Sequence, residues 1–333
     1  MDPRHLELLR LFAEYGSLAA VADLTRRSPS AVSQQVRVAE RAFGTRLLES
    51  AGRGLRLTPA GAVLAQAGAD LAVATEKAEA QWDAFRGSPS GLVRVAALTS
   101  AGAFLFGPLL AEFESTPVIV ELHDIDVAET SYAQLTAEFD IVIAHSLTGP
   151  VPAGAEDLRS VPLVREPIDV AMRSDHRLAA DQGPLHPADV ADEEWIGVPI
   201  GYPFDTVLQA IASIAGHELR VAQRLRDNRL VESILTAGER LALLPRFTTP
   251  VGASGIVLRK IAGVESERWI TALSSPHRAE RLAVRTVIEA LQRIASDVAA
   301  AHAAPAWADA DQRQSQPQLP EALRTMKHTS HMP

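Results

Sequence analysis

Helix start and stop signals divide the first 86 residues into short elements. Ser28-Pro29 and Thr58-Pro59 each join an N-cap residue to a first-turn proline, and Gly16 and Gly44 follow apolar stretches with helical spacing. We expect three helices, at residues 4–15, 17–25 and 28–43, and two strands around a glycine-containing turn, at 46–50 and 55–57. Three helices and a hairpin predict a mainly α winged helix-turn-helix domain over residues 1–58.

The third of these helices carries the polar side chains of a recognition helix. Its apolar side holds Ala31, Val32, Val36 and Ala39. Short hydroxyl and amide groups near a helix N-terminus can reach base edges in the major groove, and arginines hold phosphates. A solvated polar face would explain the glutamines equally well. The candidate DNA contacts, including Arg53 at the tip of the hairpin, are Ser28, Pro29, Ser30, Ser33, Gln34, Arg37 and Arg53.

The charge is distributed unevenly along the chain. Nine arginines and six acidic residues give residues 1–57 a charge of +3, so the chain total of −9 leaves −12 for the rest. A basic segment on an acidic body suits binding to nucleic acid. The absence of cysteine rules out thiolate catalysis, disulfides, Cys-type zinc sites and iron–sulfur clusters, and it agrees with a cytoplasmic location. No signal peptide or membrane segment is expected.

A long helix follows the hairpin, over residues 59–86. Its apolar residues recur every three or four positions, which favours a dimerisation helix over a helix that covers only its own domain's core. Residues 87–91, Gly-Ser-Pro-Ser-Gly, predict a hinge. The apolar series is Ala60, Leu64, Ala67, Leu71, Ala74, Ala78, Trp82 and Phe85.

Strand and helix patterns alternate from Leu92 onward, which predicts parallel sheet with helices on both faces. Two α/β lobes are expected within residues 92–302, lobe I at about 92–165 and 269–302 and lobe II at about 166–268. The segment at 303–333 is poor in apolar residues and predicts a disordered tail.

Residues 4–64 resemble the N-terminal domain of LysR-type transcriptional regulators. The matching segments are Gly16-Ser17, Pro29 to Gln35, Phe43-Gly44, Arg46 to Leu48, Gly52 to Gly54 and Leu57 to Gly61. A weaker resemblance extends to about residue 300, through Asp140 to Ile143, Pro162-Leu163, Asp175 to Ala179 and Leu241 to Pro245. Thr25 and Arg240 depart from the family pattern, where an apolar residue and a glycine are usual.

The resemblance implies a bacterial, sequence-specific DNA-binding regulator. Its α/β lobes would resemble periplasmic solute-binding proteins and close on a small-molecule effector. The expected partners are operator DNA, the effector, further copies of the chain as a homodimer or homotetramer, and RNA polymerase.

The effector is expected in the crevice between the lobes, at the carboxyl ends of the strands and the following helix N-termini. Thr99 and Ser100 lie at such a junction, although simple helix capping would also explain them; His145 could instead be a structural histidine. The candidate effector contacts are Thr99, Ser100, Asp126, His145, Ser146, Ile200, Gly201, Tyr202 and Phe204.

Two other classes of function remain open on sequence grounds. A winged helix fused to an α/β enzyme is one, but the chain has no GxxxxGK[ST], GxGxxG, GxSxG or HExxH motif. In His123-Asp124-Ile125-Asp126 the side chains alternate along a strand, so no metal site is expected there, and no cofactor is expected. The other class is a ligand-binding or assembly protein that does not bind DNA.

Overall fold

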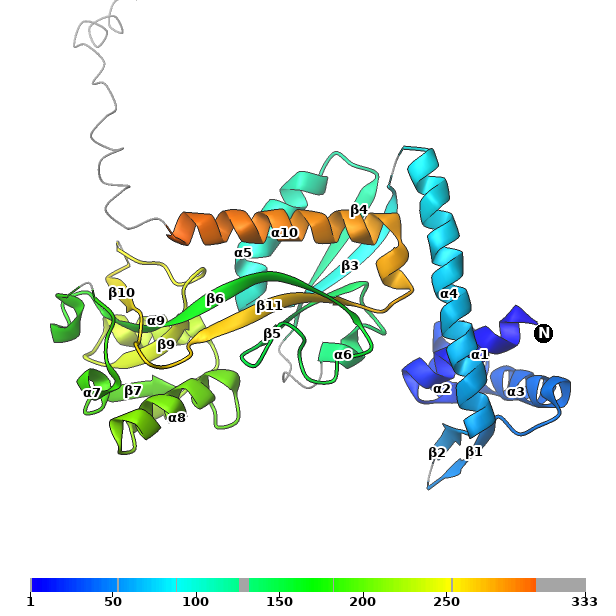
Figure 1. Cartoon of the computed structure of the whole chain (residues 1–333), viewed down its shortest axis with the longest axis horizontal. Coiled ribbons are helices and arrows are strands. Elements are labelled where there is room, and N and C mark those ends of the chain that lie inside the picture. Colours follow the sequence, from blue (N-terminus) through cyan, green and yellow to red (C-terminus); the bar gives the residue numbers. More distant parts are fainter. Residues whose placement is uncertain are drawn as a thin grey trace, which may run out of the picture.

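The computed structural model describes residues 2–52, 54–87, 89–125, 132–181, 183–252 and 254–303 (Figure 1). The N-terminal domain contains α1 (Pro3–Tyr15), α2 (Leu18–Leu24), α3 (Pro29–Phe43), β1 (Leu48–Ala51) and β2 (Gly54–Leu57), followed by α4 (Pro59–Phe85). The hydroxyls of Ser17, Ser28 and Thr58 cap the helices that follow them. Because β1 and β2 pair as an antiparallel hairpin, the predicted winged helix-turn-helix is confirmed. Arg53 lies outside the described residues.

The first half of α4 packs directly on its own domain. A Cβ atom at Gly68 would lie 2.4 Å from the carbonyl oxygen of Leu6, and one at Gly61 would lie 2.1 Å from that of Leu47. Only glycine allows the helix to approach these backbones so closely. The alternative role for α4, covering the core of its own domain, therefore holds for this half.

The second half of α4 leaves large apolar side chains uncovered in the single chain. Trp82 and Phe85 are 60% and 81% exposed and stack on each other with ring centroids 5.6 Å apart. Leu71 and Val63, which belong to the first half, lie on the same side of the helix and are also exposed. This face is free to meet another chain. Of the predicted hinge, Ser88 lies outside the described residues.

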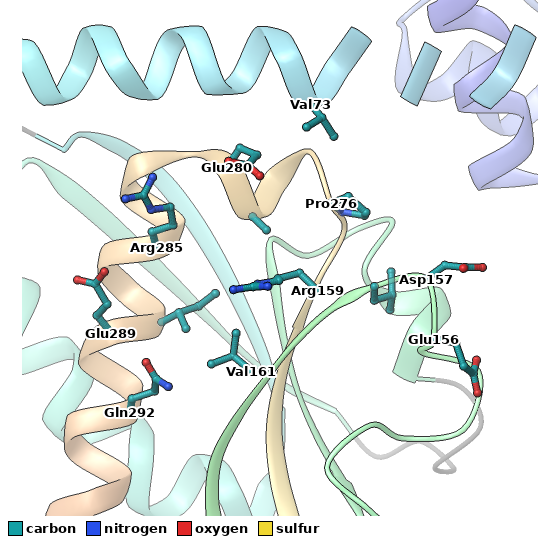
Figure 2. Close-up of a pocket in the computed structure, with 13 residues that line it drawn as sticks. Val73, Glu156, Asp157, Arg159, Val161, Pro276, Glu280, Arg285, Glu289 and Gln292 are labelled. Atoms are coloured by element: carbon teal, nitrogen blue, oxygen red, sulfur yellow. The ribbon is translucent and has the colours of Figure 1, made fainter. Parts of the chain in front are cut away.

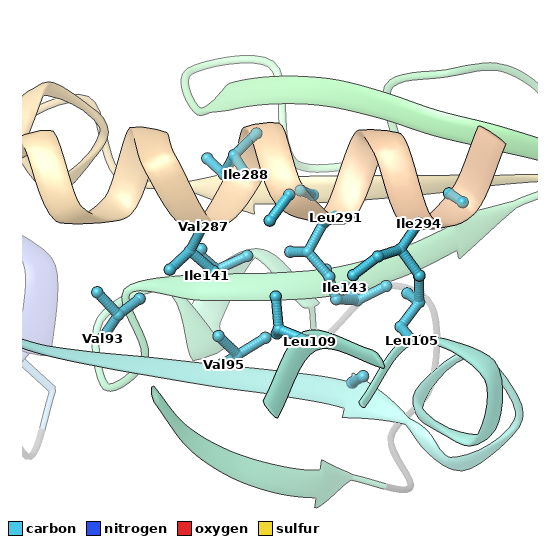
Figure 3. Packing of buried hydrophobic residues seen from close by; sticks show 14 of the residues in the cluster. Val93, Val95, Leu105, Leu109, Ile141, Ile143, Val287, Ile288, Leu291 and Ile294 are labelled. Carbon is cyan, nitrogen blue, oxygen red and sulfur yellow. The ribbon is translucent and has the colours of Figure 1, made fainter. Parts of the chain in front are cut away.

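Lobe I is built on three parallel strands, β3 (Gly91–Leu98), β4 (Val118–Ile125) and β5 (Ile141–Ser146), with β3 in the middle. The helices α5 (Thr99–Phe113) and α10 (Leu282–Ala303) pack with these strands in one apolar core, which Figure 3 shows with Val95, Leu109 and Leu291 at its centre. The short helix α6 (Tyr132–Leu135) packs against β5 in a separate cluster. Of the predicted tail at 303–333, only residue 303 is described, and it is the last residue of α10. Residues 304–333 lie outside the described part.

Lobe II contains the strands β7 (Glu194–Gly197), β8 (Arg220–Arg224), β9 (Leu241–Pro245) and β10 (Ile256–Arg259). Its helices are α7 (Pro187–Val190), α8 (Pro203–Ala215) and α9 (Asn228–Thr236). The fully buried Trp195 lies in the core with Ile211, and its indole N–H donates to the carbonyl of Val190 at 3.1 Å.

Two strands run between the lobes (Figure 1), β6 (Arg159–Arg173) and β11 (Glu267–Ser274). They are antiparallel to each other, and β11 is also antiparallel to β5, so the predicted all-parallel arrangement is wrong for the middle of the nine-stranded sheet. Parallel neighbours need a long crossover connection, whereas the described chain from β5 to β6 forms no helix. No helix among the described residues is long and apolar enough to cross a membrane.

Candidate functional site

The outer face of α3 presents unpaired polar groups. Gln34 and Arg37 are exposed, with no hydrogen bond or ion pair to a described residue. Ser30 and Pro29 are exposed in the first turn, and the Ser30 and Ser28 hydroxyls lie 2.9 Å apart. Ser28 also caps α3, and Ser33 is half-buried. The predicted contact residues that the structure describes therefore lie at the N-cap and along the first three turns of one helix.

A basic hollow lies beside the carboxyl end of α3. Its volume is about 600 Å³, and Arg37, Arg41 and Arg46 line it together with Glu40. The Glu40 carboxylate accepts the backbone N–H of Leu47 at 3.0 Å, which fixes the chain leading into the hairpin. Three guanidinium groups at one hollow suit a phosphate backbone. Sequence reasoning placed Arg46 in a segment that matches the family but did not select it as a DNA contact.

The interlobe junction is organised by a buried ion pair. Arg268 of β11 and Glu166 of β6 are paired side by side, with nitrogen–oxygen distances of 2.6 and 2.8 Å and side-chain exposures of 2% and 0%. The backbone N–H of Phe247 donates to the other Glu166 oxygen at 3.0 Å. Both carboxylate oxygens of Glu166 therefore accept hydrogen bonds, one from Arg268 and the other from the backbone of Phe247.

The guanidinium of Arg268 contacts both lobes. Its Nη2 donates to the Ser100 hydroxyl in the first turn of α5 at 2.9 Å, and its Cζ lies 5.6 Å from the centre of the Phe204 ring in the first turn of α8. Its Nη1 makes no hydrogen bond to any described residue. Any change in the distance between the N-termini of α5 and α8 must therefore change the contacts of Arg268 with Ser100 or Phe204.

His145 lies near this junction, on β5. It is 8% exposed, and its Nδ1 has no hydrogen-bond partner among the described residues. Burial, aided by the positive charge of Arg268, lowers the pKa of His145 to about 3, so the imidazole is neutral near pH 7. Its ring meets that of Tyr132 edge to face, with centroids 5.8 Å apart. An unpaired buried nitrogen leaves one polar group available to a ligand.

The other predicted effector residues are less closely grouped. Thr99 is exposed at the start of α5, and Ile200 is 76% exposed. The Tyr202 hydroxyl accepts from Arg226 at 3.3 Å, and Gly201 has a positive φ of 87°. The Ser146 hydroxyl is already engaged with Thr148 at 3.0 Å. Asp126 lies outside the described residues.

Sequence reasoning selected Ser100 and Phe204, which lie beside Arg268, and His145 near them, but it missed Arg268 and Glu166. Both charges are embedded in strands, and only their pairing across β6 and β11 explains their burial. The sequence itself shows only a charged residue just before an apolar stretch at each of these positions, which does not single either of them out.

A cavity of about 720 Å³ lies between α4 and lobe I, and its lining does not include the residues of the interlobe junction (Figure 2). Val73 of α4, Arg159 of β6 and Arg285 and Glu289 of α10 are among its lining residues. These side chains are exposed or half-buried, and the lining contains both acidic and basic residues. Among the residues that the structure describes, no group of three His, Asp or Glu side chains is placed to hold a metal ion.

A winged helix-turn-helix, a long helix and two α/β lobes joined by crossing strands define an effector-responsive DNA-binding regulator. Residues 3–62 match the family model of the bacterial regulatory helix-turn-helix protein, lysR family, and residues 86–296 match that of the LysR substrate binding domain. The chain belongs to the LysR family of transcriptional regulators, which confirms the resemblance. It is a regulator and not an enzyme, and nothing in these matches supports the fused-enzyme or non-DNA-binding alternatives.

Individual relatives agree with the family assignment. The chain is 25% identical to the transcriptional dual regulator GltC of Bacillus subtilis, over 74% of this chain and 82% of that protein. It is 24% identical to the DNA-binding transcriptional dual regulator OxyR of Escherichia coli, over 88% and 95% of the two chains. The fold is similar to that of a full-length OxyR variant from Pseudomonas aeruginosa, with a TM-score of 0.59 and 19% identity over 89% and 94% of the chains.

Proposed function

We propose that this regulator responds to a small carboxylate that binds between the lobes at Ser100, Arg268 and His145. Arg268 is the main support, because a buried guanidinium with a free Nη1 at the junction of two lobes offers fixed donors to an oxyanion. The N-terminal N–H groups of α5 would add a partial positive charge beside Ser100. Phe204 and Tyr202 would cover the apolar part of the molecule.

The charge balance at this junction determines how a carboxylate would be held. Glu166 already neutralises Arg268, and the neutral His145 adds no charge of its own. An incoming carboxylate would therefore be stabilised by hydrogen-bond donors rather than by a free cation. Such a site favours ligands whose size and shape match the donors over simple inorganic anions.

A thermal-shift screen tests the effector site. Short monocarboxylates, dicarboxylates and amino acids are added to the full chain, with phosphate and sulfate as anion controls. We expect at least one carboxylate to raise the melting temperature, and Ser100→Val to abolish this rise without changing DNA affinity in the absence of carboxylate. Ser296→Val, on the exposed side of α10, is the control. A Ser100→Val protein that responds like the wild type contradicts the site.

The outer face of α3 is proposed as the DNA-reading surface, with the hairpin residue Arg53 as a phosphate contact. We expect Arg37→Ala to weaken binding on all sequences and to reduce the salt slope by about one unit. Gln34→Ala should change the preference among operator variants by about 1–3 kcal/mol per base pair read. Fluorescence anisotropy at several salt concentrations measures both, with Arg293→Ala in lobe I as the control. Wild-type salt dependence for Arg37→Ala would exclude the phosphate contact.

Several further assignments belong to the same proposal. The chain would divide into a DNA-binding domain at 1–58, a dimerisation helix at 59–86, a hinge at 87–91 and an effector domain at 92–302, and it would act in the cytoplasm. Some relatives are named as hydrogen peroxide-inducible activators. A thiol-based response to peroxide is not available here, because the chain contains no cysteine.

A further inference from the structure

The carboxyl end of α1 contacts lobe I of the same chain. The Tyr15 hydroxyl donates to the carbonyl oxygen of Ala137 at 2.6 Å, across 122 positions of sequence. Beside it, burial raises the pKa of Glu14, against the opposing effect of the Arg10 and Arg278 guanidiniums. A carboxyl group on the outside of a small helical domain is buried in this way only when another part of the chain covers it.

The lobe I side of this contact is held rigidly by its own bonds. Arg278 also donates to the Ala137 carbonyl, at 2.6 Å. The Asp140 carboxylate accepts from Arg281 at 2.7 Å and from the backbone N–H of Arg94 at 2.9 Å. Burial lowers the pKa of His277 to about 4, with the Arg10 charge acting in the same direction. The segment that receives Tyr15 is therefore tied to β3 and to the chain before α10.

The same segment begins beside the interlobe junction, next to the proposed effector site. Tyr132, the first residue of α6, is 1% exposed and packs against His145, and Ala137 follows it by only five residues. A displacement of His145 or Tyr132 therefore reaches the Tyr15 contact through one short helix and its final turn. No other contact between the N-terminal domain and lobe I in the described residues has both a hydrogen bond and a direct chain link to the crevice.

We propose that the surface around Ala137 and Arg278 is a docking site for the carboxyl end of α1, and that α6 couples this docking to the state of the crevice. When α1 is docked on lobe I, the direction in which α3 faces is fixed. When α1 is released, the N-terminal domain can turn about the hinge. The coupling rests on the proposed effector site, whereas the docking contact does not. Tyr15 and Tyr132 are positioning residues in this scheme, since neither needs to touch DNA or effector.

Distance measurements on the full chain test the docking. Because the chain has no cysteine, Asp23→Cys and Glu114→Cys introduce the only two thiols for spin labels, one on α2 and one beside lobe I, both exposed. An excess of unlabelled chain keeps one labelled copy per oligomer. Loss of the Tyr15 hydrogen bond in Tyr15→Phe should raise the undocked population about 2- to 10-fold. Arg293→Gln, which removes an exposed ion pair with Glu112, should match the wild type.

A Tyr15→Phe distance distribution identical to that of the wild type overturns the docking site. For the coupling, Tyr132→Leu should shift the distribution in the same direction as Tyr15→Phe. Any carboxylate that raises the melting temperature of the wild type should also shift the distribution, in either direction, and this test remains available if Tyr132→Leu does not fold. Unchanged distances in these samples overturn the coupling. The spin-labelled Tyr15→Phe and Tyr132→Leu proteins are measured without ligand. A failed carboxylate screen therefore contradicts only the proposed effector class.

Discussion

Replacing Arg268 with methionine is expected to lower the free energy of unfolding of the lobes by about 3–5 kcal/mol. Methionine fills much of the space of the arginine side chain but leaves the fully buried carboxylate of Glu166 without its partner. A urea titration followed by tryptophan fluorescence measures the loss, with Trp195 and Trp269 as reporters in the lobes. The same variant should lose the carboxylate-induced thermal shift.

The double variant Arg268→Met with Glu166→Gln separates charge from packing. Glutamine can still accept the N–H of Phe247, and no charge remains buried, so much of the lost stability should return. Arg293→Met is the matched control, because it removes an exposed ion pair and should cost at most about 1 kcal/mol. A loss below about 1 kcal/mol for Arg268→Met would mean that water reaches Glu166 and that the junction is open.

Replacing Leu71 with glutamate is expected to disperse the oligomer and to lower affinity for a two-half-site operator by about 100-fold or more. Leu71, Trp82 and Phe85 lie on one exposed side of α4, and a carboxylate buried between two such helices would have no partner. Sedimentation velocity gives the size of the species, and anisotropy with whole and half operators gives the affinity. Binding to a single half-site should change much less.

The control for this variant is Ala62→Glu. Ala62 is also exposed on α4 but lies about half a turn round the helix from Leu71. An acidic residue near a helix N-terminus is well tolerated. An unchanged sedimentation coefficient for Leu71→Glu at micromolar concentration would show that chains associate through another surface, and α4 would then serve its own domain alone.

Local chemistry explains which parts of the fold were predictable. The Ser-Pro and Thr-Pro pairs give the starts of α3 and α4 at Pro29 and Pro59, and Gly16 and Gly44 take positive φ angles of 73° and 69° at the ends of α1 and α3. The 15-residue strand β6 cannot be recognised over its full length from the sequence, because Pro162, Pro167 and the charged pair between them interrupt its apolar pattern. β10 gave no recognisable signal.

The candidate sites also contain residues that the sequence could select and residues that it could not. The polar face of α3 follows from helical periodicity, so Gln34 and Arg37 could be selected without a structure. The strand-to-helix junction likewise located Ser100. Arg268 could not be selected, because its partners Glu166 and Ser100 are 102 and 168 positions away and meet it only when β6 pairs with β11 and the first turn of α5 comes into contact with β11.

By itself the sequence determined the caps, the helix phases, the strand-to-helix alternation and the basic N-terminal charge, because each depends on neighbours within a few residues. The tertiary structure decided the antiparallel crossing of β6 and β11, the close approach of Gly61 and Gly68 to other backbones and the burial of Arg268. It also decided the contact of Tyr15 with Ala137. These features depend on packing between distant segments, where the cost of burying a charge or a backbone is set by the partner that the fold supplies.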